Sequence, residues 1–180
     1  MRTLAFLAVL AHAGAADFVI DPTQSHVAFT LSDVLHTVHG NFKVKRGSIH
    51  FDPSGAASGE IVVDATSGDS GSGARDKRMH QNILDSQKFP EITFAPSRLR
   101  GTVDPSGESK VEIDGTFTIH GASHPLTASA VVTVSSDHLR TNVHFAVPYV
   151  AWGIKNPSTL FLKVAETVDI DLDAAGRISW

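Results

Sequence analysis

The sequence comprises 180 residues with a formal net charge of −4 and no cysteine. Its lysines and arginines are scattered, which argues against nucleic-acid binding, and the absence of cysteine excludes thiol enzymes and zinc-thiolate modules. A chain of this length fills one β-sandwich or barrel, so we expect a single domain over residues 17–180.

The segment MRTLAFLAVLAHAGAA, residues 1–16, is typical of a secretory signal peptide. Arg2 supplies a positive charge, an apolar run follows over residues 4–10, and small residues occupy the cleavage region. We therefore expect cleavage near Ala15 or Ala16 and a periplasmic or secreted mature protein. An ordered N-terminal strand is the alternative. The apolar run is too short to cross a bilayer, and no later stretch predicts a membrane span.

Short alternating segments predict β-strands after the leader. Residues 26–31 carry apolar side chains on one face, and Pro22 lies in a turn signal just before them. Gly40 and Gly47 interrupt the alternation further along. The pattern therefore predicts four or five short strands before residue 67.

Residues 74–88 form the one convincing helix pattern in the chain. Met79, Ile83 and Leu84 recur at helical spacing, and Pro90 cannot continue the helix. The Gly/Ser run that precedes this pattern is expected to be a flexible linker. Because the apolar stripe is narrow, the helix should lie on, or across the end of, something built by the strands.

Beyond the helix, apolar residues alternate along a further series of short strands joined by turns, and the last two are expected around residues 160–164 and 168–172. Successive strands with hairpin-like connections and a single helix predict an all-β fold, an antiparallel up-and-down barrel of about eight strands with the helix inserted. A β-sandwich is the alternative. A barrel of this size either fills with side chains or holds one small ligand.

The apolar face of these strands carries almost no charge, which predicts an apolar barrel interior. A catalytic acid or base would then have to come from the loops, and this favours binding over catalysis. The same face mixes phenylalanines with Ala128 and Ala130, which either leave room for a ligand or make space for a neighbouring ring. The residues alone leave a ligand cavity and a filled core equally open.

No motif in the sequence predicts a metal site or a catalytic centre. The histidine pairs His36-x-x-His39 and His120-x-x-x-His124 fall in strand or turn contexts and match no zinc-enzyme pattern. No nucleophile elbow of the form G-x-S-x-G occurs. We therefore expect no catalytic residue, no metal and no cofactor.

Four stretches of the sequence resemble the YceI-like family. They are ARDKRMHQNILDSQKFPEITF in the helix region, DPTQSHVAFTL near the start, GNFKVKRGSIHFD in the middle and GTFTIHGASHPLT further on. The resemblance covers essentially the whole mature chain, and the helix segment is its most specific part.

The resemblance implies a lipocalin-like barrel whose apolar pocket binds a polyisoprenoid chain, either a polyprenyl phosphate or the tail of an isoprenoid quinone. The role implied is transport, storage or sequestration in the periplasm. On this basis we expect Arg75 and Arg78 to contact a head group. The residues expected to line the pocket are Phe29, Leu31, Ile61, Val63, Met79, Ile83, Leu84, Phe94, Ile113, Phe117, Ala128, Ala130, Val143 and Phe145.

Two other functions remain open from the sequence. One is a filled barrel that acts as a structural or partner-binding protein. The other is an enzyme that acts on a bound isoprenoid and uses His36, His39 or Asp76 at the barrel mouth as acid and base. A homodimer is possible whichever function applies.

Overall fold

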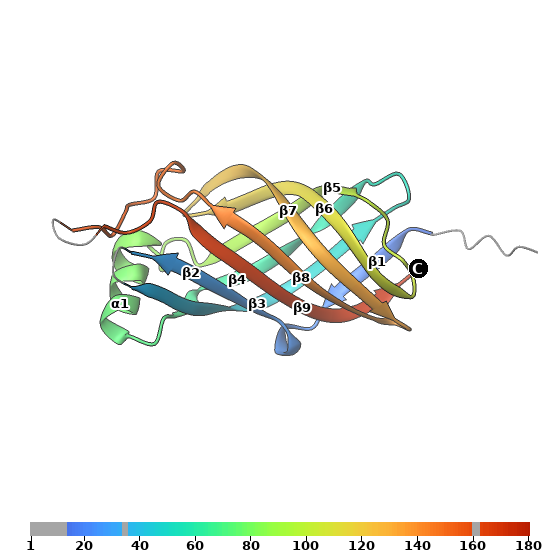
Figure 1. Ribbon diagram of the computed structural model, residues 1–180, viewed down its shortest axis with the longest axis horizontal. Coiled ribbons are helices and arrows are strands. Elements are labelled where there is room, and N and C mark those ends of the chain that lie inside the picture. The colour runs from blue at the N-terminus through green and yellow to red at the C-terminus, as the bar shows by residue number, and fades with distance from the viewer. Residues whose placement is uncertain (1–13, 34–35, 160–162) are drawn as a thin grey trace, which may run out of the picture.

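The protein is a single antiparallel β-sheet that closes into a barrel, with one short helical segment at one end (Figure 1). The computed structural model describes residues 14–33, 36–159 and 163–180. The strands are β1 (Ala16–Ile20), β2 (His26–Ser32), β3 (Thr37–Phe51), β4 (Ala57–Asp69), β5 (Glu91–Arg100), β6 (Gly107–Ile119), β7 (Ala122–Ser135), β8 (His138–Val147) and β9 (Val168–Ser179). Within the described residues, no helix has the length and apolar character needed to cross a membrane.

The barrel has eight strand positions, because β1 and β2 share one of them. Both strands pair with β3 on one side and with β9 on the other. A 3-10 turn at Pro22–Gln24 separates the two pieces. The pairing of β3 with β4 completes the ring, so the expected barrel of about eight strands is confirmed and the sandwich is excluded.

The strands are longer and less interrupted than the sequence predicted. The strand β3 runs unbroken through both Gly40 and Gly47, because its neighbours continue to pair with it on each side. The expected strand around residues 160–164 is not formed in its described part, where Val164 makes only an isolated bridge with Asp33, and residues 160–162 lie outside the described residues. The predicted signal peptide also lies largely outside them, although Ala16 begins β1 and is fully buried.

The helix expected over residues 74–88 is shorter than predicted. The α-helix α1 spans Gly73–Arg78, and a single wide turn, η2, continues it over Met79–Ile83. Asp85 then adopts a left-handed conformation with φ of 45°, which ends the helix. The His80 ring contacts the hydroxyl of the buried Ser86 at 3.0 Å and the carbonyl oxygen of Gly68 at 2.9 Å, so tertiary contacts fix this ending.

A β-bulge in β3 keeps the apolar side chains of this long strand inside the barrel. Phe42 and Val44 point inward, and after an extra residue Ile49 and Phe51 point inward again. Lys45 and Arg46 therefore both face outward although they are consecutive.

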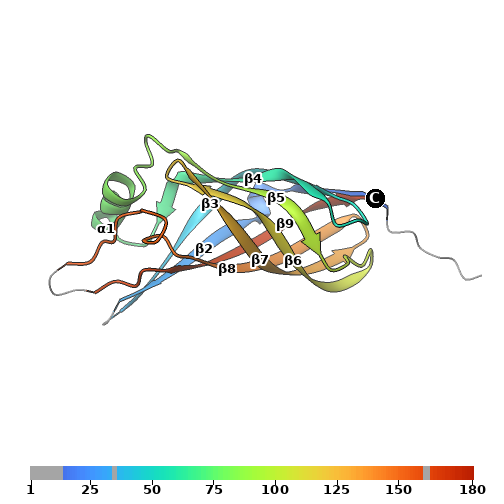
Figure 2. The same ribbon diagram turned by 90° about the horizontal axis from the view of Figure 1, so that it is seen from above.

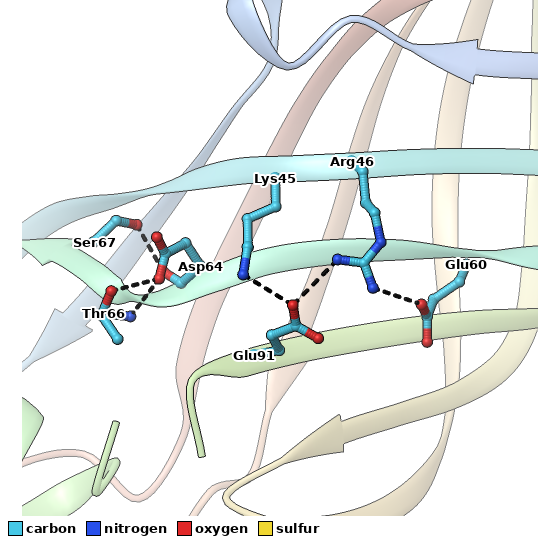
Figure 3. A network of polar contacts seen from close by, with 7 residues as sticks. All are labelled: Lys45, Arg46, Glu60, Asp64, Thr66, Ser67 and Glu91. Carbon is cyan, nitrogen blue, oxygen red and sulfur yellow. Dashed lines mark hydrogen bonds and ion pairs between the residues drawn. The ribbon is translucent and has the colours of Figure 1, made fainter. Parts of the chain in front are cut away.

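The two basic side chains at the bulge form a polar network on the outside of the barrel (Figure 3). Lys45 Nζ lies 2.9 Å and Arg46 Nη1 3.1 Å from the same carboxylate oxygen of Glu91 on β5. Both side chains reach across β4, where the outward-facing Val62 is only 1% exposed. The network therefore covers an apolar residue as well as linking three strands.

The network predicts a pH-dependent contribution to stability. Hydrogen bonds from Lys45 and then Arg46 hold the pKa of Glu91 below its ordinary value. A carboxylate with a lowered folded-state pKa stabilises the fold at neutral pH, and this contribution disappears as the pH falls through that pKa. We expect Glu91→Gln to be less stable than the wild type at neutral pH and to approach it in acid, as measured by urea unfolding at both pH values.

A matched control is Glu60→Gln, because Glu60 approaches Arg46 at 3.6 Å, too far for a strong hydrogen bond. This variant should show a smaller pH-dependent loss. Equal losses in the two variants would contradict the role assigned to Glu91.

Candidate functional site

An apolar cavity of about 620 Å³ occupies the inside of the barrel. Inward-facing side chains from all nine strands border it, together with residues from α1 and η2. This volume lies within the range of small-molecule binding sites in proteins. The barrel is therefore not filled by its own side chains.

Two glycines help to keep the cavity open. Gly40 pairs directly with Phe29, and a side-chain carbon at this glycine would lie 2.3 Å from the phenylalanine ring. Gly115 pairs with Pro96 and lies diagonally across from Phe94, and a side-chain carbon there would lie 2.6 Å from the Phe94 ring. Because these rings rest against bare backbone, they lie along the wall and take up less of the interior.

The helical segment and the connection between β8 and β9 lie together at one end of the barrel (Figure 2). Met79, Ile83 and Leu84 border the cavity from this side, as expected for a helix that covers a barrel end. Arg78 Nη2 donates a hydrogen bond of 3.0 Å to the carbonyl oxygen of Pro157 in the connection. We call this end the mouth.

Among the residues that the structure describes, three charged ones border the cavity, and all of them lie at the mouth. They are Arg75, Arg78 and Asp33. Asp33 accepts a hydrogen bond of 2.7 Å from the backbone N–H of His36. These two guanidinium groups and one carboxylate give the described cavity rim a net positive charge beside an apolar interior.

Arg75 is held in place by the Gly/Ser run before the helix, which is ordered here rather than a free linker. Its Nε and Nη2 donate to the hydroxyl and carbonyl oxygens of Ser70, at 2.7 and 2.8 Å. The Ser70 hydroxyl and N–H in turn donate to the Asp76 carboxylate, and these bonds hold the pKa of Asp76 below its ordinary value. Ser70 thus fixes the orientation of the Arg75 side chain.

The structure places the expected pocket residues on the cavity wall, with one exception. Ala130 faces inward and is buried, but it does not border the cavity. Its cross-strand neighbours Val111 and Val143 both border it, so their longer side chains cover the alanine methyl group. The wall positions of Phe29, Leu31, Ile61, Val63, Met79, Ile83, Leu84, Phe94, Ile113, Phe117, Ala128, Val143 and Phe145, and the mouth positions of Arg75 and Arg78, agree with the expectation. Ligand binding by these residues stays a prediction.

The sequence analysis missed a polar residue in the apolar wall. Thr141 lies on the inward face of β8 between Leu139 and Val143 and borders the cavity. Its hydroxyl is covered and has no hydrogen-bond partner among the described residues. The alternation of β8 contained the signal, since Thr141 has the same parity as the two apolar residues.

The residues considered for acid–base catalysis do not form a site in the described structure. His39 faces outward on β3, where its ring contacts the Thr30 hydroxyl at 3.1 Å, and His36 is exposed. Neither histidine borders the cavity, and the carboxylate of Asp76 is bound to Ser70. Across the described ranges, no group of three or more histidine and acidic side chains could hold a metal ion.

Comparison with known proteins gives matches in sequence and in structure. Residues 18–175 match the YceI-like domain family. A UPF0312 protein of Vibrio parahaemolyticus is 34% identical over 124 residues, which cover 66% of this chain and 64% of that relative. The chain thus spans just under two thirds of that relative's length.

Two solved structures share the fold. The protein BcnA of Burkholderia cenocepacia superposes with a TM-score of 0.72 at 18% identity, over 87% of this chain and 99% of BcnA. A polyisoprenoid-binding domain from Saccharophagus degradans superposes with a TM-score of 0.66 at 14% identity, over 90% of this chain and 98% of that domain.

The unpartnered hydroxyl of Thr141 leads to a stability prediction. A covered hydroxyl without a partner costs about 1–3 kcal/mol, and valine has nearly the same shape without that cost. We expect Thr141→Val to unfold at higher urea concentration than the wild type, by a free energy of about that size. The control is Thr127→Val, because the Thr127 hydroxyl donates to Asp114 at 2.6 Å and its loss should not stabilise. A destabilised Thr141→Val protein would mean that the hydroxyl has a partner in solution.

Proposed function

Because the chain belongs to the YceI-like family, we propose that it is a non-enzymatic binding protein that holds the apolar chain of a polyisoprenoid lipid inside its barrel. The observation that carries this proposal is the apolar cavity, bordered by aliphatic and aromatic side chains along its length and by charge only at the mouth, within the described residues. The fold shared with the polyisoprenoid-binding domain of Saccharophagus degradans gives further support.

The physical chemistry of the wall suits a long hydrocarbon. Burial contributes about 0.8 kcal/mol per methylene, and the cost of ordering a flexible chain offsets part of this gain. A wall without repeated hydrogen-bonding groups cannot select a ligand by its polar pattern. Selection must then come from the shape and length of the chain and from the head group.

The mouth favours an anionic head group over a neutral one. Arg75 is already oriented by Ser70, so little side-chain entropy is lost when it meets a ligand. Guanidinium groups bind phosphate oxygens through paired, charge-assisted hydrogen bonds. Of the two ligand classes implied by the sequence, the proposal therefore prefers a polyprenyl phosphate to an isoprenoid quinone.

The proposed role is transport, storage or sequestration of this lipid in a periplasmic or secreted setting. The filled-barrel alternative has less support because the interior is open. The enzymatic alternative also has less support, since the described candidates for acid and base do not border the cavity.

Filling the cavity with a larger side chain tests whether a ligand occupies it. Ala128 borders it from β7, opposite Ile113 on β6, so Ala128→Trp should fill the middle of the cavity with an indole ring. We expect this variant to lose at least about tenfold in lipid loading, measured by mass spectrometry of an organic extract from protein purified without detergent.

Val131→Trp is the matched control, because Val131 lies on the same strand but is 37% exposed on the outer face. It should load lipid like the wild type. Undiminished loading of folded Ala128→Trp would refute the placement of the ligand in the barrel.

Removing a charge at the mouth tests recognition of the head group. Arg78→Gln should weaken binding of a polyprenyl phosphate about tenfold or more, since a hydrogen bond to a charged group contributes about 1.5–3 kcal/mol. Binding of the matching prenyl alcohol, which carries no charge, should hardly change. Titration monitored by native mass spectrometry measures both affinities.

Lys77→Gln removes a charge from the same helix at a residue that does not border the cavity, and it serves as the control. An equal loss of affinity for the phosphate and the alcohol in Arg78→Gln would show that Arg78 supports the structure of the mouth and does not bind the head group.

A further inference from the structure

The cavity is closed at the end opposite the mouth. Inward-facing residues at that end, Ala16, Val134 and Ile178, are 0%, 2% and 3% exposed and belong to the main core cluster, but they do not border the cavity. They fill the barrel beyond the point where the cavity stops. The last residues that still border it there are Phe18, Phe51, Val103 and Leu139, which we call the floor.

The floor is built from segments that are far apart in the sequence. Phe18 on β1 pairs with Ile49 on one side and Ile178 on the other, so the short first strand places a ring across the barrel end. The ring of Phe51 meets the ring of Trp180 edge-on, with centroids 6.1 Å apart. Aromatic packing of this kind gives the floor a fixed position.

Val103 reaches the floor from a connection rather than from a strand. It lies between β5 and β6 and is only 4% exposed. The backbone N–H of Asp104 donates to the Ser109 hydroxyl at 2.8 Å, and that of Ser106 donates to the Asp104 carboxylate at 2.8 Å. These bonds hold the connection folded while Val103 closes the barrel from below.

The distance from floor to mouth can be followed along β8. Alternate residues of this strand border the cavity from Leu139 to Val147. Eight residue steps at about 3.3 Å, on a strand tilted by about 40°, correspond to a depth of about 20 Å along the barrel axis. A chain longer than this depth must fold back or leave its excess outside.

We propose that the floor sets the length of hydrocarbon chain that the barrel accepts, which makes Phe18, Phe51 and Val103 specificity-determining residues. The inference rests on the proposed function, because it assumes that a chain lies in the cavity with its head at the mouth. A chain shorter than the cavity leaves wall unfilled, and a longer one leaves methylenes in water, at about a fourfold loss of affinity for each methylene not buried.

The test compares tail-length preference in variants that change depth and in one that changes only width. Phe51→Ala lowers the floor. Ala174→Leu raises it, because Ala174 borders the cavity opposite Thr141, two positions closer to the mouth than the pairing of Leu139 with Gly176. Phe29→Ala is the control, since it removes the same ring from a side wall.

The probes are farnesyl phosphate, geranylgeranyl phosphate and longer polyprenyl phosphates, offered as an equimolar mixture to the full chain. Native mass spectrometry then measures the share of each bound species, and thermal unfolding confirms that each variant is folded. We expect the wild type to prefer an intermediate length, Phe51→Ala to shift toward longer tails by at least about fivefold in the bound ratio, and Ala174→Leu to shift toward shorter ones. Phe29→Ala should keep the wild-type preference.

Other outcomes distinguish a failure of the inference about the floor from a failure of the proposed function. Equal shifts in Phe51→Ala and Phe29→Ala would show that volume rather than depth selects the ligand, and would overturn the inference. If Phe51→Ala does not fold, Ala174→Leu is sufficient as a test, and an unchanged tail-length preference in this variant overturns the inference. A wild type that binds all lengths equally refutes the floor but leaves the proposed function intact, whereas a wild type that binds none of the probes refutes the proposed function.

Discussion

The backbone pairing of β3 with β4, and of β2 with β9, closes the sheet into a ring. Within the described residues every strand pairs with a neighbour on each side, so the sheet has no free edge strand, and alternate side chains face the water and the interior. Each strand must then keep its apolar side chains on the inward face along its whole length. The bulge at Lys45 and Arg46 does this for β3, and the outward charges that it produces are paired with Glu91.

The two ends of the ring differ in chemistry, and this difference makes the barrel a container with one opening. At one end, buried side chains and the connection that carries Val103 pack the interior solid. At the other, a helical segment and a long connection lie together (Figure 2), and Arg75 and Arg78 of the helical segment border the cavity. Between them, rings that lie against Gly40 and Gly115 leave the middle open. An elongated amphiphile matches this order of environments.

The features that could be predicted from the sequence depend on the pattern of apolar and polar residues within single segments. They are the barrel, the inward orientation of most wall residues and the position of the helix. The features that could not be predicted depend on contacts between distant segments. The helix ends early because His80 meets Ser86 and Gly68 and because Asp85 turns left-handed. Ala130 is covered by longer neighbours, which no alternation pattern reveals. Thr141 has the same parity on β8 as Leu139 and Val143, so its place on the wall follows from local alternation, whereas the lack of a partner for its hydroxyl does not.

The contact between Arg78 and the Pro157 carbonyl joins the helical segment to the connection at the rim of the barrel. The wall is held by strand pairing around the whole ring and cannot part without breaking many hydrogen bonds at once. The rim is joined by contacts between a short helical segment and a connection, whose local opening costs far less than opening the sheet. Entry and exit of a ligand would then depend on opening of the rim, so loss of this contact should change both rates in addition to any effect of Arg78 on the head group.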